Sequence, residues 1–190
     1  FPNQISNEDF TIKEFDKIFK KYKNKKFFID ESYFGFGHKS FIKLIKKHKN
    51  IFILRSVTKT FGLAPHRIGF LIAHQDTLKK FRNFQTPYPL SIFSGKLLDF
   101  FLNNINLIKK YQKEVELNRD FITTELRNKG YLVNNPKGNF INILLNKKEK
   151  IQILNKSSKM RFTFKESEIS KKNFLRVTIG KFKTMRNILK

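Results

Sequence analysis

The sequence contains no cysteine and no apolar run long enough to cross a membrane. The lack of cysteine excludes disulfide bonds, thiolate nucleophiles and cysteine-ligated metal ions. A membrane-spanning helix needs roughly 18–20 apolar residues, and every apolar run here is shorter. The N-terminus also lacks the basic and then apolar profile of a secretory signal. We therefore expect a soluble protein located in the cytoplasm.

Acidic residues are scarce. The chain of 190 residues has 15 Asp and Glu against 40 Lys and Arg, which gives a formal charge of +25. Such a charge is compatible with a non-catalytic nucleic-acid-binding domain, because basic faces release counterions from phosphates. However, the lysines are scattered through nearly every segment of a chain that is also rich in Phe, Ile and Asn. This combination is typical of an AT-rich coding sequence, so composition explains the charge more simply than nucleic-acid binding does. The same field would attract small phosphorylated or carboxylated molecules.

The most informative pattern is a short apolar run, Ile51–Leu54, that leads into a polar loop. The run has the length and β-branched content of a strand covered on both faces. The loop carries Lys59 with hydroxyl groups at Ser56 and Thr58, and Arg67 follows. A lysine, hydroxyl groups and an arginine that leave one edge of a sheet can hold a carbonyl cofactor that bears a phosphate. None of the four histidines has a partner at metal-ligand spacing, so we expect no metal site.

A second apolar run, Phe27–Ile29, ends at Asp30. Between the two runs, residues 39–47 mix apolar residues with lysines in the manner of a crossover helix. Two parallel strands joined by such a helix have their carboxyl ends at the same edge of the sheet, where ligands collect in α/β proteins. The pattern therefore predicts that Asp30 and Lys59 share one site.

These motifs resemble those of a known family. The stretch SVTKTFGLA at residues 56–64, followed by Arg67–Gly69, resembles the pyridoxal-phosphate lysine motif of class I/II aminotransferases. It is most similar to the histidinol-phosphate aminotransferase branch. The resemblance implies that Lys59 is the catalytic residue and binds pyridoxal 5′-phosphate (PLP) as a Schiff base. It also implies that the cofactor phosphate is contacted by Ser56, Thr58 and Arg67.

The run DESY at residues 30–33 is similar to the family's Asp-Glu-Ala-Tyr. The resemblance implies that Asp30 pairs with the pyridine nitrogen and that Tyr33 binds the ring hydroxyl. Residues 1–7 resemble the family turn Asn-Pro-Asn-Asn-Pro-Thr-Gly, with Gln4 at the position of the asparagine that lies beside that hydroxyl. Those residues also read as an ordinary turn before a helix.

Two arginines near the C-terminus are candidate anion sites, because a guanidinium binds a carboxylate with two parallel hydrogen bonds. Arg176 lies in LRVTIG, which resembles the family's Leu-Arg-Ile-Thr-x-Gly, so it would bind the substrate α-carboxylate. Arg161 matches the arginine that the histidinol-phosphate branch uses near the substrate phosphate. It also reads simply as a charged strand residue.

The run TPYP at residues 86–89 must be extended or turned, because each proline disfavours helix in the residue before it. It resembles the family's hinge. We therefore predict residues 1–86 as part of the PLP-binding large domain and residues 87–190 as the small C-terminal domain. The predicted fold class is α/β: a partial fold-type I PLP-transferase, with the mostly parallel sheet of the large domain followed by a smaller α+β domain. A long helix is expected over residues 105–129, with Gly130 as its stop.

The resemblance implies a cytoplasmic, homodimeric transaminase of amino-acid biosynthesis. Such an enzyme moves an amino group between an amino acid, with histidinol phosphate as a candidate, and a 2-oxo acid. Because the likeness covers only the back part of a family member, we expect a fragment of a longer enzyme that is inactive alone. A related PLP enzyme, such as a decarboxylase of an amino-acid phosphate, is the main alternative. A nucleic-acid-binding domain is the other.

Overall fold

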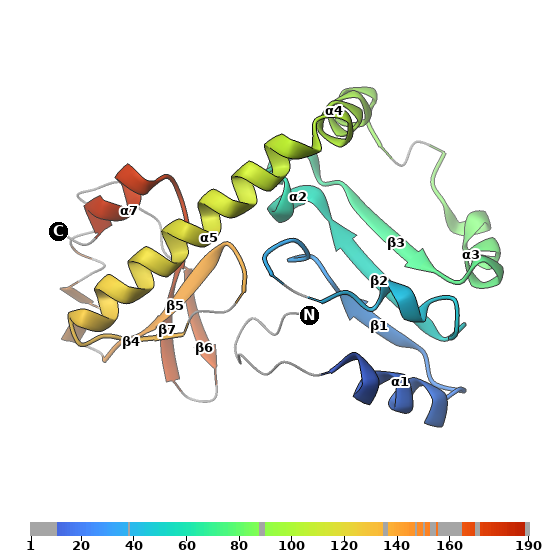
Figure 1. Cartoon of the computed structure of the whole chain (residues 1–190), viewed down its shortest axis with the longest axis horizontal. Helices are drawn as coiled ribbons and strands as arrows, with labels where there is room; N and C mark the ends of the chain where they lie inside the picture. Colours follow the sequence, from blue (N-terminus) through green and yellow to red (C-terminus); the bar gives the residue numbers. More distant parts are fainter. Residues whose placement is uncertain are drawn as a thin grey trace. The chain divides into compact units, whose positions relative to one another are not determined.

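The computed structural model describes residues 11–37, 39–87, 90–134, 137–146, 148–149, 151–152, 155, 165–169 and 172–188. The chain divides into two compact units, of which the first extends to Gln112 and the second starts at Lys113 (Figure 1). The boundary predicted between residues 86 and 87 concerns the family's functional domains and stays a prediction. Among the described residues, no helix is long and apolar enough to span a membrane.

The first unit contains a three-stranded sheet in the order β1 (Phe27–Asp30), β2 (Ile51–Ser56) and β3 (Gly69–Ala73) (Figure 1). Strands β1 and β2 are parallel, as predicted, with Asp30 opposite Leu54. Strand β3 is antiparallel to β2 and returns directly from the loop that contains Arg67. Because β1 and β2 run the same way, their carboxyl ends lie at one edge of the sheet.

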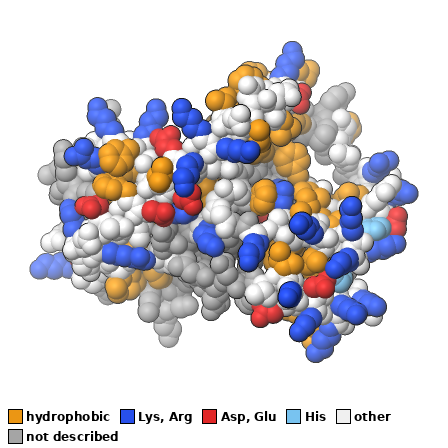
Figure 2. Space-filling model, in the orientation of Figure 1, with side chains coloured by type: hydrophobic (Ala, Val, Ile, Leu, Met, Phe, Trp, Pro, Cys, Tyr) orange, Lys and Arg blue, Asp and Glu red, His pale blue; other side chains and the backbone are white. Residues whose placement is uncertain are grey.

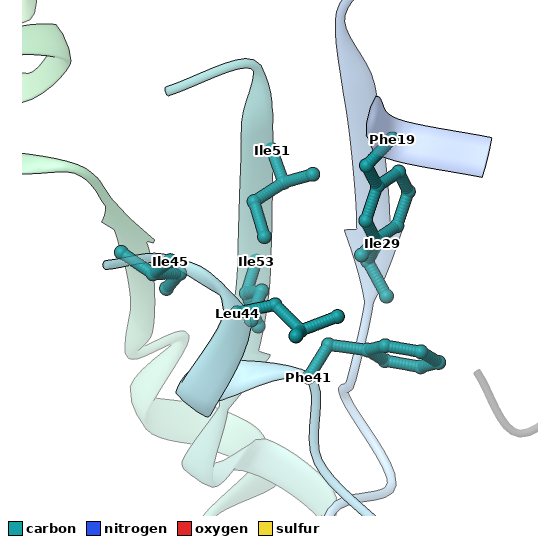
Figure 3. Packing of buried hydrophobic residues seen from close by; sticks show 7 residues of the cluster. All are labelled: Phe19, Ile29, Phe41, Leu44, Ile45, Ile51 and Ile53. Carbon is teal, nitrogen blue, oxygen red and sulfur yellow. The ribbon is translucent and has the colours of Figure 1, made fainter. Parts of the chain in front are cut away.

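The core of this unit lies on one face of the sheet, where seven buried side chains form a cluster (Figure 3). They come from helix α1 (Ile12–Lys21), strands β1 and β2, and the segment between those strands. Helix α1 starts at Thr11, whose hydroxyl accepts the N–H of Glu14 while the Glu14 carboxylate accepts the N–H of Thr11. The members of the cluster are Phe19, Ile29, Phe41, Leu44, Ile45, Ile51 and Ile53.

The connection between β1 and β2 differs from the predicted crossover helix. It forms only a short 3-10 turn, η1 (Ile42–Leu44). The buried carboxylate of Glu31 accepts the N–H of Phe41 at 2.8 Å and the Ser40 hydroxyl at 2.9 Å. These bonds fix the start of the segment to the end of β1.

The opposite face of β1 and β2 carries exposed apolar side chains. Phe28 is 60% exposed, and its ring stacks on that of Phe52 at 4.7 Å. Leu54 is 40% exposed on the same face. Asp30 pairs in register with Leu54 and therefore also lies on this face.

The rest of the first unit is helical. It consists of α2 (Val57–Thr60), η2 (Ala64–His66), α3 (Gln75–Phe81), η3 (Arg82–Phe84), α4 (Ile92–Asn103) and the start of α5 (Ile105–Asn128). Ser91 caps α4, because its hydroxyl accepts the N–H of Ser94 at 3.1 Å. A second apolar cluster joins α4 to the lysine loop through Val57, Leu63, Ile68 and Leu98.

The second unit contains most of α5 and an antiparallel sheet in the order β4 (Leu132–Asn134), β5 (Phe140–Leu144), β7 (Lys172–Thr178) and β6 (Lys165–Ile169). Helix α7 (Phe182–Ile188) follows the last of these strands. The long helix ends within one residue of its predicted end, and Gly130 follows with φ 85°. Ile122 of α5 and Ile141 of β5 are fully buried in this unit.

Basic side chains are dispersed over the visible face in Figure 2 and do not gather in one patch. Apolar side chains lie between them.

Candidate cofactor site at the carboxyl ends of β1 and β2

Lys59 lies on α2, a single helical turn that follows β2 directly. Ser56 caps this turn, because its hydroxyl oxygen accepts the N–H of Thr58 at 3.1 Å. The Thr60 hydroxyl donates to the carbonyl of Ser56 at 2.9 Å and closes the turn from its other end. The hydroxyl groups that flank the lysine therefore fix the turn on which it stands.

The ammonium of Lys59 lies over the ring of Tyr33, 4.2 Å from the ring centroid. A cation at this distance is attracted by the negative face of an aromatic ring. Tyr33 is buried and belongs to the loop that follows β1, whereas Lys59 belongs to the loop that follows β2. The structure thus brings two predicted site residues together from two neighbouring strands.

Asp30 is the last residue of β1 and receives two hydrogen bonds from Ser32, one from its N–H at 2.8 Å and one from its hydroxyl. Partial burial acts to raise the pKa of this carboxyl. The two bonds from Ser32, with a smaller contribution from the positive charge of Lys59, act in the opposite direction, and the pKa lies below its ordinary value. Asp30 is therefore ionised at neutral pH, as partnership with a protonated pyridine nitrogen requires.

Arg67 is exposed and has a left-handed backbone, with φ 51° and ψ 35°. Among the residues that the structure describes, it is the one non-glycine residue with positive φ. The following carbonyl, that of Ile68, accepts the Ser56 hydroxyl at 3.1 Å and the N–H of Val57 at 3.2 Å. These bonds hold the arginine segment against the start of the lysine turn.

Sequence reasoning missed a buried ion pair beside the site. Glu31 is 3% exposed. Its carboxylate accepts a hydrogen bond from Nε of Arg55 and forms an ion pair with Nη2 of the same residue, both at 3.0 Å. Nη2 of Arg55 also donates to the Ser40 hydroxyl at 2.6 Å, and the guanidinium lies 3.7 Å from the ring centroid of Phe34. This network ties the loop that contains Tyr33 to strand β2. An arginine at the end of an apolar strand, with an acid after the preceding strand, was the available signal.

The predicted carboxylate-binding residue, Arg176, lies on β7 in the second unit. Its guanidinium carbon is 4.2 Å from the ring centroid of Phe140, and its Nε is 3.4 Å from Oδ1 of Asn142. The ring and the amide restrict the orientation of the guanidinium. The other two predicted site residues, Gln4 and Arg161, lie outside the described residues.

Comparison with known proteins gives the family. The model of the family described as aminotransferase class I and II matches residues 7–190. The chain belongs to this family. A histidinol-phosphate aminotransferase of Thermotoga neapolitana is 27% identical over 192 residues, which cover all of this chain and 55% of that protein. The chain thus spans about half the length of this curated relative.

Solved structures show the same fold. The histidinol-phosphate aminotransferase of Sinorhizobium meliloti, solved in complex with PLP, has a TM-score of 0.86 at 15% identity, covering 99% of this chain and 53% of that one. The L-threonine-O-3-phosphate decarboxylase of Porphyromonas gingivalis has a TM-score of 0.78 at 20% identity, covering 99% and 60%. The chain therefore has part of the fold-type I PLP-transferase fold, and the predicted fold class is confirmed.

Proposed function

We propose that this chain carries the lysine-bearing part of a PLP-dependent aminotransferase, which transfers an amino group between an amino acid and a 2-oxo acid. The main support is the position of the Lys59 ammonium against the Tyr33 ring, at the strand end that also carries Asp30. Membership of the aminotransferase class I and II family supports this proposal.

The residues present fit the cofactor group by group. An aldehyde requires an amine, which Lys59 supplies, and a protonated ring nitrogen requires a carboxylate such as that of Asp30. The ring hydroxyl would be bound by Tyr33, and by Gln4. The phosphate would be held by the hydroxyl and guanidinium groups of Ser56, Thr58 and Arg67. When bound, PLP supplies an electron sink that stabilises negative charge at the substrate Cα.

The protein contributes proton transfer and orientation. The Lys59 amine would act as the general acid and base: it would take the proton from the substrate Cα and deliver it to C4′, the carbon of the cofactor aldehyde, which is the proton shift that amino-group transfer requires. The ionised Asp30 would keep the ring nitrogen protonated. Tyr33, buried below the lysine, limits where Nζ can move.

On the substrate side, we propose that Arg176 binds the α-carboxylate and that Arg161 contacts a substrate phosphate. Asn142 and Phe140 hold the Arg176 guanidinium in one orientation, which lowers the entropy lost on binding. The relatives' names favour a phosphorylated amino substrate such as histidinol phosphate. We further propose a cytoplasmic homodimer that acts in amino-acid biosynthesis, with residues 1–86 and 87–190 as its functional domains.

A second candidate is decarboxylation of an amino-acid phosphate. It is favoured by the fold likeness to the L-threonine-O-3-phosphate decarboxylase, and it would use the same lysine, carboxylate and phosphate contacts. The two reactions differ in the bond that breaks at Cα. They are therefore distinguished by their products, a 2-oxo acid or carbon dioxide.

The first experiment tests cofactor attachment on the 190-residue chain. PLP is added, the adduct is reduced with borohydride, and the labelled lysine is located by peptide mass spectrometry. We expect preferential labelling of Lys59, because its amine lies beside the Tyr33 ring among the groups proposed to bind the PLP ring and phosphate, and much weaker labelling of an exposed lysine such as Lys79. The Lys59→Ala variant is the control. Equal labelling of Lys59 and Lys79 would contradict the proposed function.

The second experiment assays turnover. Because we expect the 190 residues to be inactive alone, histidinol phosphate with 2-oxoglutarate, and threonine phosphate alone, are supplied to a PLP-treated longer protein that contains this chain. Release of glutamate supports the aminotransferase, and release of carbon dioxide supports the decarboxylase.

A further inference from the structure

Helix α5 contacts the lysine turn through two adjacent side chains near the end of the first unit. The side-chain amide of Gln112 donates from Nε2 to the carbonyl of Thr60 at 3.1 Å. The Tyr111 hydroxyl lies 3.5 Å from the carbonyl of Lys59. A single helical turn leaves its last carbonyls without partners inside the helix. Helix α5 therefore supplies the missing donors at the residue that carries the amine and at the next one.

The same glutamine contacts the other loop of the site. Gly35 lies in the loop that follows β1 and has φ 104°. A Cβ atom built on Gly35 would be 2.4 Å from Nε2 of Gln112 and 2.9 Å from its Cδ. A Cβ there would force the Gln112 amide to move, because this amide packs directly on the backbone of the loop that contains Tyr33.

Gln112 thus bridges two loops whose separation decides the geometry of the site. It hydrogen-bonds the turn of Lys59 on one side and packs against the loop of Tyr33 on the other. It lies 52 residues after Thr60 in the sequence, so neither strand nor turn geometry imposes this contact. Tyr111 supports the arrangement, with its ring 6.5 Å from that of Phe36 in the first loop.

We infer that Gln112 is a positioning residue for the lysine chemistry. By joining the carbonyl of Thr60 to the backbone at Gly35, it sets the distance between the Lys59 amine and the loop that presents Tyr33 and follows Asp30. The inference deepens the proposed function and rests on it for its chemical consequence. The mechanical part, a bridge between two loops, rests on the contacts alone.

Two substitutions separate positioning from packing. Gln112→Met keeps the length and approximate volume of the side chain but removes the N–H donor. Gln112→Glu keeps the shape and places a carboxylate oxygen opposite the Thr60 carbonyl. Gln85→Ala, at an exposed glutamine of the same unit, is the matched control.

The first measurement uses the cofactor-free protein and follows amide hydrogen exchange in residues 31–37 and 57–63. Removal of one hydrogen bond is expected to raise exchange by about fivefold in the loops that it supports. We expect both loops to respond together in Gln112→Met and Gln112→Glu, and neither to respond in Gln85→Ala. Faster exchange in one loop only, or in neither, would overturn the bridge.

The second measurement is the rate of PLP attachment to Lys59, trapped with borohydride, alongside the thermal unfolding midpoint. A positioning role predicts that Gln112→Met attaches PLP about fivefold more slowly than the native chain, whereas Gln85→Ala attaches it at the native rate. The unfolding midpoints show whether the two variants are similarly stable when these rates are compared. Unchanged attachment in both glutamine variants refutes the positioning role. If the native chain itself shows no preference for Lys59, the proposed function fails and the positioning role fails with it, whereas the exchange data still decide whether the bridge exists.

Discussion

The buried ion pair between Glu31 and Arg55 leads to an asymmetric prediction. In Arg55→Met, the Glu31 carboxylate stays buried at 3% side-chain exposure and keeps only the Ser40 hydroxyl and the Phe41 N–H as donors. An uncompensated buried charge costs about 3–5 kcal/mol. In Glu31→Gln, the guanidinium of Arg55 is left 19% exposed and can reach water, so we expect a smaller loss of about 1–3 kcal/mol.

The prediction is tested by the urea dependence of hydrogen exchange in residues 41–56, which reports on strand β2 and therefore on the first unit. A double-mutant cycle should give a coupling of about 1.5–3 kcal/mol, the range for hydrogen bonds to charged groups. Lys49→Met is the matched control. Its exposed pair with Asp76 has 66% and 54% side-chain exposure, and we expect its loss to cost below about 1 kcal/mol.

The reasoning is refuted if Arg55→Met costs less than about 1 kcal/mol, or if Glu31→Gln is the more damaging of the two substitutions. Loss of the hydrogen bonds that Arg55 makes to Glu31 and Ser40 should also displace the loop that contains Tyr33. We therefore expect Arg55→Met to slow PLP attachment to Lys59, whereas Lys49→Met should leave it unchanged.

Four further outcomes are expected. Lys59→Ala should abolish turnover and PLP labelling at that position, checked by absorbance and peptide mapping. Because the folded-state pKa of Asp30 is lowered, its ionisation adds stability above the unfolded pKa of about 4, and this stability disappears as pH falls through the folded value. Asp30→Asn should therefore be less stable than the native chain at pH 7, and the difference should shrink as the pH falls through the folded-state pKa of Asp30, as measured by urea unfolding. Asn142→Ala should raise KM for the 2-oxo acid, whose carboxylate Arg176 is proposed to bind, by about tenfold with little change in kcat, because the Arg176 guanidinium loses an orienting acceptor; a fall in kcat alone would contradict this. Gly35→Ala should destabilise the first unit by more than about 1 kcal/mol, since φ 104° and the nearby Gln112 amide both oppose a side chain; a neutral effect on urea unfolding would contradict the described contact.

The sequence predicts the parts of this fold that depend on local patterns. The apolar runs before Asp30 and Lys59 indicated parallel neighbours, and β1 and β2 are parallel. The i, i+3, i+4 spacing of apolar residues and the glycine at position 130 located helix α5 to within one residue. The lysine motif, read together with its family resemblance, led to the class I and II aminotransferase family.

The interactions that sequence reasoning missed are long-range ones. Glu31 pairs with a side chain 24 residues away, and Gln112 bonds a carbonyl 52 residues away. For the Glu31–Arg55 pair, the sequence offered only the positions of an acid and an arginine at the ends of neighbouring strands, and for Gln112 it offered no signal. The crossover segment was predicted as a helix from its mixture of apolar residues and lysines, but its short turn follows from bonds to the Glu31 carboxylate.

The left-handed backbone of Arg67 sets the stability of the loop against the need for a guanidinium at this position. Glycine adopts such a backbone readily, whereas a residue with a Cβ does so at the expense of stability. Replacing this arginine with glycine would remove the backbone strain and stabilise the loop, but it would also remove the only guanidinium among the predicted phosphate contacts. Stability and phosphate affinity therefore oppose each other at this position.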